Sequence, residues 1–159
     1  MKFDTVKQNL EARGYAVQVF STGKEAADYL DAAIDKTSVG FGGSATLEAL
    51  GLYERLGTHN QTVWHWKWED KDAARREAMV SDVYLTSVNG LAETGELVNI
   101  DGAGNRAAAT LFGHEKVYFV IGQNKLAPAY DGAVWRARNI AAPQRARQLG
   151  KKTPCAVKC

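Results

Sequence analysis

The sequence predicts an α/β fold in which helices cover both faces of a mostly parallel sheet. Apolar runs typical of buried strands, such as 83–87 and 116–122, alternate along the chain with segments of helical periodicity. This alternation favours parallel strands, because each crossover helix covers one face of the sheet. A chain of 159 residues suits one domain and can bury roughly 70% of its unfolded surface, so the fold requires no disulfide or metal.

Capping residues mark the predicted elements of the N-terminal half. Asp4 is the expected N-cap of a helix over 3–13, and Thr22 with Glu25 forms a capping box at the start of the next helix. The other elements predicted in this half are strands at 15–20, 38–42 and 62–68, a helix that Ser44 caps and Gly51 ends, and a helix from Asp70 to Met79.

The C-terminal half continues the alternation of strands and helices. Strands are expected at 83–87 and 97–100, and the turn at 93–97 favours a local antiparallel hairpin. The remaining predicted elements are a helix at 105–112, a strand at 116–122 and a helix at 128–141. The last helix is expected to end before Pro143, because proline has no N–H to continue the helical hydrogen bonds.

The net charge of +2 hides an uneven distribution of charge. Residues 1–131 carry 13 basic and 18 acidic side chains, whereas residues 132–159 carry seven basic side chains and no acidic one. A basic segment can seek nucleic acid or a phosphorylated ligand. A solvated helix face that pairs with the acidic body is the simpler interpretation. The segment lacks the regular aromatic interleaving of a nucleic-acid platform, so no nucleic-acid partner is expected.

The sequence predicts a cytoplasmic protein. The first residues, MKFDTVKQNLEARG, are charged and lack the apolar core of a signal peptide. No apolar run is long enough to span a bilayer, so we expect no membrane partner.

The glycine-rich stretch GFGGSAT at 40–46 is a candidate anion site. An apolar strand runs into glycines and then into a helix N-terminus, where free N–H groups and the helix dipole favour negative charge. Ser44 can bond a carboxylate or phosphate, or it can only cap the helix. The stretch is not a Walker loop, and Ala45 occupies the third glycine position of a dinucleotide fingerprint. Tight-turn geometry explains the glycines equally well.

A second candidate site is the segment DGAGNR at 101–106. Arg106 falls in the first turn of a predicted helix, where a cation opposes the helix dipole. Either a bound anion or a salt bridge to Asp101 or Glu93 would compensate for this. We expect DGAGNR and GFGGS to converge on one cleft, because both follow apolar strands and open helices at the carboxyl edge of the sheet.

Glu93 is the candidate for catalysis, because a carboxylate in a loop after a buried strand can act as a nucleophile or general base. Equally, Glu93 can cap the backbone amides of its own turn.

The remaining polar and aromatic candidates carry weaker signals. The three histidines show no metal-ligand spacing, and Cys155 with Cys159 supplies only two of the ligands that a zinc or cluster site needs. We therefore expect reduced thiols, no metal ligand set and no cofactor in this chain. Trp64, Trp66 and Trp68 alternate and are expected on one strand face, as core, ligand platform or subunit contact.

Several blocks of the sequence resemble the lactate-utilisation (LUD) domain family. The blocks are SVGFGGSATLEALGL, SDVYLTSVNGLAETGELVNIDGAGNRAAATLFG, KVYFVIGQNKL and RARNIAAPQRARQLGKKTPC, which together span residues 35–155. The resemblance implies a Rossmann-like three-layer αβα sandwich similar to the NagB/RpiA/CoA-transferase group. The positions that match the family pattern are Gly42, Gly43, Ser44, Thr46, Glu48, Glu93, Thr94, Gly95, Asn99, Asp101, Gly104, Asn105 and Arg106.

The resemblance also implies a function. It points to a bacterial or archaeal component in the oxidation of lactate or related 2-hydroxy acids, in a system whose partner proteins carry iron–sulfur clusters. A non-redox accessory protein with a small anionic ligand, a carboxylate or phosphate, is one hypothesis. The alternative is a stand-alone enzyme of acyl or CoA-ester transfer or hydrolysis with Glu93 at its centre. A homo-oligomer is compatible with either.

The resemblance divides the chain into a LUD domain at 1–150, with an N-terminal helix, and the start of a cysteine-containing tail at 151–159. Many members continue into a cysteine-rich tail, whereas this sequence has the shorter TPCAVKC. Further cysteines, in a longer gene product or in a partner, are expected to complete any metal site.

Overall fold

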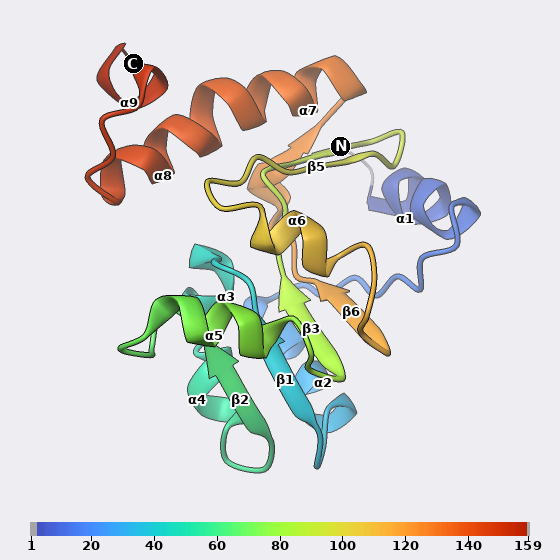
Figure 1. Ribbon diagram of the computed structural model, residues 1–159. Coiled ribbons are helices and arrows are strands. Elements are labelled where there is room, and N and C mark those ends of the chain that lie inside the picture. Colours follow the sequence, from blue (N-terminus) through green and yellow to red (C-terminus); the bar gives the residue numbers. More distant parts are fainter. Residues whose placement is uncertain (1–2, 159) are drawn as a thin grey trace. The chain divides into compact units, whose positions relative to one another are not determined.

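A computed structural model describes residues 3–158 and divides the chain into two compact units (Figure 1). The parallel-sheet unit consists of Phe20–Ser87 and Ala103–Ile121. The terminal unit consists of Met1–Val19, Val88–Gly102 and Gly122–Cys159, and its described part begins at residue 3 and ends at residue 158. Each unit is therefore assembled from segments that are distant in the sequence.

The parallel-sheet unit is built on four parallel strands in the order β2-β1-β3-β6. β1 (Ser38–Phe41) lies between β2 (Gln61–Trp64) and β3 (Val83–Thr86), and β3 also pairs with β6 (Lys116–Phe119). The helices of the unit are α2 (Gly23–Ala33), α3 (Ala45–Ala49), α4 (Leu52–Leu56), α5 (Lys71–Ala78) and α6 (Asn105–Ala109). The predicted α/β fold with a parallel sheet is confirmed.

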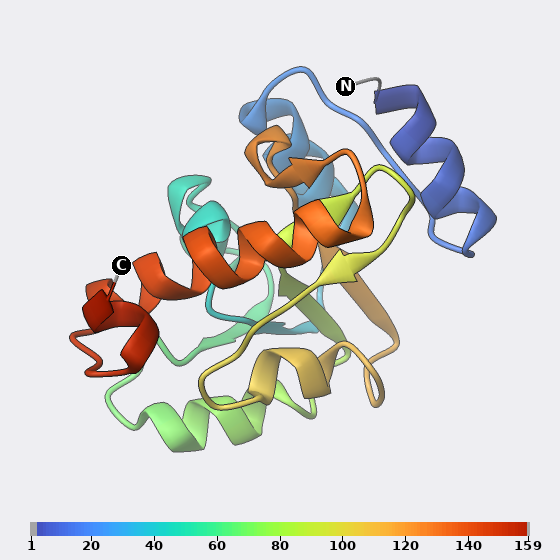
Figure 2. The same cartoon turned by 90° about the horizontal axis from the view of Figure 1, so that it is seen from above.

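Helices cover both faces of this sheet, because alternate strand residues point to opposite sides. Phe41, Trp64 and Leu85 lie side by side in the register and pack on one face with residues of α2, α3 and α4. Val63 and Tyr84 point to the other face and pack with α5 and α6. Figures 1 and 2 show α5 and α6 on one side of the sheet and α2 and α4 on the other. The unit is thus a Rossmann-like three-layer sandwich.

Three helix starts form as the capping residues predict. The Thr22 hydroxyl accepts from Glu25 N at 3.2 Å, and the Glu25 carboxylate accepts from Ser21 N at 3.0 Å. Ser44 Oγ accepts from Leu47 N at 3.3 Å at the start of α3. At the start of α5, Asp70 accepts from two main-chain N–H groups. These side chains satisfy amides that the first helical turn leaves without a partner.

The terminal unit contains a three-stranded sheet and most of the C-terminal helices. β4 (Gly90–Ala92) pairs antiparallel with β5 (Leu97–Val98), which confirms the predicted hairpin, and parallel with β7 (Leu126–Ala127). Ala133 of α7 packs on Ala92 and Ala127. The helical elements of the unit are α1 (Phe3–Ala12), the 3₁₀ turn η1 (Gln123–Lys125), α7 (Tyr130–Arg136), the π-helical segment η2 (Ala137–Ala141), α8 (Ala142–Gln148) and α9 (Pro154–Lys158).

Two predicted strands are wrong in whole or in part. Residues 15–20 form no strand, and Tyr15 and Val19 are exposed, so the alternation in this segment buries no face. The predicted strand 62–68 ends at Trp64, where the chain turns and Lys67 N donates to Trp64 O at 2.9 Å. The three tryptophans therefore do not share a strand face. Trp64 is fully buried, whereas Trp68 is 40% exposed.

The C-terminal helix does not end before Pro143, as the sequence predicts. It widens into the π-helical segment η2 and continues as α8, with Pro143 in the first turn of α8. A proline is tolerated there, because the N–H that it lacks would have no partner in the regular helical pattern. Pro143 is buried.

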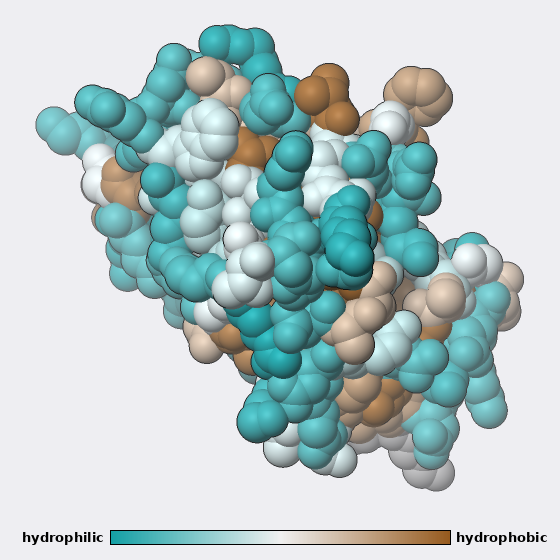
Figure 3. Space-filling view, turned by 90° about the horizontal axis from the view of Figure 1, so that it is seen from below, coloured by the Kyte–Doolittle hydropathy of each residue, from teal (hydrophilic) through white to brown (hydrophobic). Residues whose placement is uncertain are grey.

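One face of the molecule shows apolar side chains as small separated areas among hydrophilic ones (Figure 3). Within residues 3–158, no helix combines the length and the apolar character that crossing a membrane requires.

Candidate functional site

The loop between β1 and α3 lies at the carboxyl end of the parallel strands and leaves no room for a side chain at Gly42. Gly42 N donates to Leu85 O at 2.8 Å and so extends the pairing of β1 with β3. A Cβ atom on Gly42 would lie 2.8 Å from Thr86 Oγ1 and 3.0 Å from Tyr84 Oη. Tyr84 and Thr86 are two residues apart on β3 and point to the same face. Only glycine fits at this position, because these approaches are shorter than a van der Waals contact.

Arg106 lies beside the same glycine. Its Cγ atom would be 3.2 Å from a Cβ on Gly42, and its guanidinium Nη1 donates to Ser87 O across a long 3.5 Å. The side chain is buried, with 8% of its surface exposed. Gly104 precedes α6 with a φ of +79°, a conformation that glycine adopts without strain and that starts the helix carrying Arg106. The structure thus brings the GFGGS loop and Arg106 together.

Ser44 has a structural role that the sequence allowed as one of two alternatives. Its hydroxyl oxygen caps α3, and the residue is buried. Because a hydroxyl can donate while it accepts, its O–H stays chemically suited to an oxyanion. Thr46 follows in the first turn of α3 and is half-buried. α3 has only five residues, so its dipole adds little here.

Trp66 is a neighbour of this loop that the sequence did not indicate. Three atoms of its indole would lie 3.2–3.3 Å from a Cβ on Gly43. The ring also stacks on Trp64, with centroids 4.9 Å apart and planes inclined by 18°. The indole is therefore packed between Trp64 and Gly43. The alternation of tryptophans was the only signal for it, and that pattern suggested a strand instead of a turn.

Glu93, Asn99 and Asp101 belong to the terminal unit. The main chain of Glu93 is held on both sides, since its N donates to Ala127 O at 2.8 Å and its O accepts from Asn9 Nδ2 at 2.7 Å. Its side chain is half-buried. The Oδ1 atom of Asn99 is buried and accepts no hydrogen bond from the described residues. Asp101 is half-buried in the loop after β5.

Glu96 provides the side-chain contacts of the hairpin turn. Its carboxylate accepts from the Thr94 hydroxyl and forms an ion pair with Arg13 at 2.7 Å. The Thr94 hydroxyl holds the pKa of Glu96 below its usual value. Gly95 has a φ of +99°, and Arg13 also donates to Thr94 O. Arg13 at the end of α1 is therefore fastened to this turn.

The opposite end of the parallel strands carries a polar depression of about 570 Å³. It is lined by residues that include Thr37, Ser38, Asn60 and Asp82. The Asp82 carboxylate accepts from Ser38 Oγ at 2.6 Å and from Thr37 Oγ1 at 3.2 Å, so these polar groups already bond one another. In open α/β sheets ligands bind at the carboxyl ends of strands. The depression is therefore a weaker candidate than the Gly42–Arg106 region.

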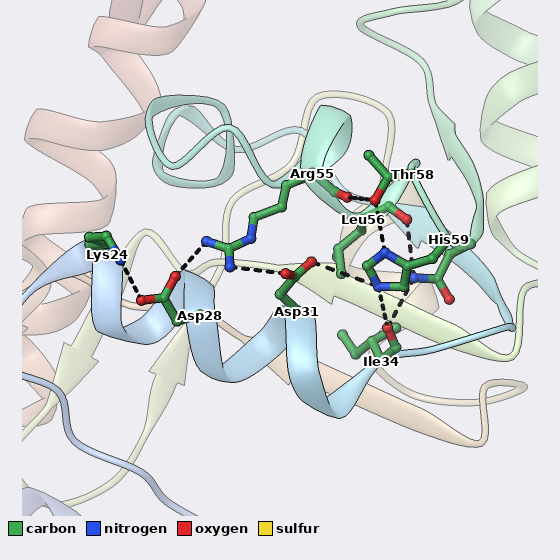
Figure 4. A network of polar contacts seen from close by, with 9 residues as sticks. Lys24, Asp28, Asp31, Ile34, Arg55, Leu56, Thr58 and His59 are labelled. Atoms are coloured by element: carbon green, nitrogen blue, oxygen red, sulfur yellow. Dashed lines mark hydrogen bonds and ion pairs between the residues drawn. The ribbon is translucent and has the colours of Figure 1, made fainter.

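An ionic network joins α2 to α4 and the loop that follows α4 (Figure 4). Arg55 bridges Asp28 at 2.7 Å and Asp31 at 2.9 Å, and Lys24 also pairs with Asp28. His59 Nε2 lies 3.1 Å from Ile34 O. These contacts explain the charged residues of α2 as ties between helices.

Cys155 is an exposed free thiol with its Sγ 3.2 Å from Thr153 Oγ1. Cys159 lies outside the described residues, so the expectation for the two cysteines together stays a prediction. Within residues 3–158, no three histidine, cysteine or acidic side chains are grouped closely enough to hold a metal ion.

Comparison with known proteins identifies one family. A model of the LUD domain matches residues 3–158, which is nearly the whole chain. No curated protein and no solved structure matches it.

Proposed function

The chain belongs to the LUD domain family and is a lactate-utilisation-type protein, and on this premise we propose that it is a non-redox accessory component in the oxidation of lactate or related 2-hydroxy acids. In this role it binds a small anionic group, a carboxylate or phosphate, at the GFGGS loop and Arg106. It acts beside partner proteins that carry iron–sulfur clusters.

The packing of Arg106 against Gly42 is the observation that supports the anion site. The arginine side chain packs on Gly42, beside Tyr84 and Thr86. Arginine presents a planar fork of donors that suits carboxylate and phosphate oxygens. A small anion at this loop would use the fork together with the Ser44 hydroxyl.

The sequence supports a non-redox role. Cys155 and Cys159 supply only two of the ligands that an iron–sulfur cluster needs. The loop after β1 lies where the ligand of a Rossmann-type fold binds. The side chains that gather there are Tyr84, Thr86, Arg106 and Trp66. Such groups can bind and orient a ligand.

The test of the anion site is titration calorimetry with L-lactate, D-lactate, glycolate and inorganic phosphate, one at a time at constant ionic strength. Arg106→Lys keeps the charge and removes the fork, and Arg106→Gln removes the charge. Arg76→Gln is the matched control, because Arg76 is exposed on α5 of the same unit. We expect saturable binding of one of these anions to the natural chain and to Arg76→Gln, and a loss of about tenfold or more in both Arg106 variants. Equal affinity in all four proteins would refute the site.

The accessory role is tested by purifying the tagged chain from its native organism under anaerobic conditions. We expect a partner that mass spectrometry identifies as an iron–sulfur protein, with iron in proportion to it. A chain that purifies alone and turns over a CoA ester would favour the acyl-transfer alternative instead.

A further inference from the structure

Arg136, the last residue of α7, has no carboxylate side chain among the described residues to balance its charge. All 18 acidic side chains of the chain lie within the described residues, and none of them forms an ion pair with this arginine. The side chain is half-buried. Partial removal of a charged group from water costs free energy, which a partner of opposite charge would offset. The surroundings of Arg136 therefore need an explanation.

Two main-chain carbonyls hold the guanidinium instead. Nε donates to Asn124 O at 2.8 Å, and Nη1 donates to Asn89 O. Carbonyl oxygens orient the fork but leave its charge unbalanced, and burial lowers the pKa of Arg136 below its usual value. Within the described residues, Nη2 donates to no protein atom. One edge of the fork is thus left for another acceptor.

Asn89, which supplies one of the two carbonyls, is itself held in place. Asn89 N donates to Val98 O at 2.9 Å, and Asn89 Oδ1 accepts from Ile100 N at 2.8 Å. Gly90 packs directly on the main chain of α7, where a Cβ would lie 2.5 Å from Ala133 O. The start of β4 and the end of α7 are therefore in close contact. A guanidinium held in this way is oriented before any ligand arrives, which lowers the entropic cost of binding.

The helix changes form directly after Arg136. The π-helical segment η2 begins at Ala137, and Asn139 Nδ2 of this segment donates to Trp135 O of α7 at 2.8 Å. π-helical turns are rare and occur frequently at functional sites. Trp135, next to the arginine in sequence, is 59% exposed. Both observations point to the end of α7 independently of the charge argument.

We propose that Arg136 anchors an anion-binding site of the terminal unit. The site binds a carboxylate or a phosphate group at the edge of the guanidinium that donates to neither carbonyl. The ligand supplies the negative charge that the acidic side chains of the described residues do not. This site goes beyond the proposed function, which rests on Arg106 in the parallel-sheet unit, and each arginine can be tested while the other is left unchanged.

The test follows the Arg136 Nε–H resonance of the ¹⁵N-labelled full chain during titration with sodium phosphate and, separately, sodium acetate. Sodium chloride keeps the ionic strength constant. We expect a saturable shift of this resonance with one of the two anions, which also identifies the group that the site prefers. Arg136→Met should weaken that binding by about tenfold or more. Arg138→Met is the matched control, since Arg138 is exposed on the same basic segment, and it should bind as the natural chain does.

The alternative is a purely structural strut between α7, β4 and η1. In that case Arg136→Met lowers the melting temperature, while the Nε–H resonance of the natural chain gives only the same small, unsaturated shift with phosphate, acetate and chloride. That result overturns the proposal. If Arg136→Met does not fold, Arg136→Lys and the titration of the natural chain still decide, because a saturable, anion-specific shift has no counterpart in a strut.

Discussion

The Cγ atom of Arg106 lies 3.2 Å from the position that a Cβ on Gly42 would occupy. Gly42 follows β1 and Arg106 lies in α6, so two segments separated by more than half of the parallel-sheet unit meet at this point. The contact explains why the loop after β1 is glycine-rich. A larger residue at 42 would displace the arginine, Thr86 or Tyr84.

Gly42→Ala is therefore expected to destabilise the protein by about 1–3 kcal/mol, as overpacking of a well-packed site does. Urea unfolding followed by circular dichroism measures this as a lower midpoint at an unchanged slope. Gly102→Ala is the matched control, because a Cβ on Gly102 meets no atom within 4 Å. If the two variants unfolded at the same urea concentration as the natural chain, the close packing at Gly42 would be contradicted.

Gly43→Ala should also destabilise the protein, for a different reason. The added methyl group would press on the indole of Trp66, which its stacking on Trp64 keeps from moving away. In a Trp66→Leu background the same substitution should cost less, because leucine is smaller and more flexible. A double-mutant cycle in urea is expected to give a coupling of at least about 0.5 kcal/mol. Strictly additive effects would mean that Gly43 and Trp66 are energetically independent.

Asp82 should make the stability of the protein sensitive to acid. The Ser38 hydroxyl, the Ser38 N–H and the Thr37 hydroxyl hold the pKa of this carboxyl below its usual value of 3.8. A folded pKa below the unfolded one stabilises the protein above the unfolded pKa, and this stabilisation is lost as the pH falls through the folded pKa. The effect is therefore present at neutral pH and fades below about pH 4.

The test measures the unfolding midpoints of the natural chain and of Asp82→Asn from pH 7 to the acid range and takes their difference at each pH. We expect this difference to shrink as the pH falls. Ser38→Ala should move the titration of Asp82 in the folded protein back toward its usual range, because it removes the strongest donor. A difference that does not depend on pH would show that the hydrogen bonds of Asp82 do not favour its charged form.

Glu93→Gln should leave the stability within about 0.5 kcal/mol of the natural chain. The contacts that fix this position are made by its main-chain N and O, and the substitution retains both. Incubation with acetyl-CoA and intact-mass measurement then separates the two functions. An accessory protein gives no adduct, whereas an acyl adduct that Glu93→Gln abolishes would establish Glu93 as the nucleophile of an acyl-transfer enzyme.

The sequence predicted helix starts and strands correctly where one strong local interaction determines the local structure. Thr22, Ser44 and Asp70 cap helices as expected, because a capping hydrogen bond spans only two or three residues. The apolar runs at β1 and β3 became buried parallel strands, because runs of this kind need cover on both faces. The motif residues of the GFGGS loop and Arg106 were also identifiable from the sequence.

Tertiary packing decided what depends on residues far apart in the chain. Alternation predicted strands at 15–20 and 62–68, but the first has no partner strand and the second turns at Trp64 so that Trp66 can reach Gly43. Proline signalled a helix end at Pro143, yet a π-helical turn carries the helix past it. In the sequence Arg136 is one cation of a basic segment, and only the folded chain shows that it bonds two carbonyls and none of the acidic side chains of the described residues. Capping and burial periodicity are local and readable in sequence, whereas close approach and charge compensation are set only when distant segments meet.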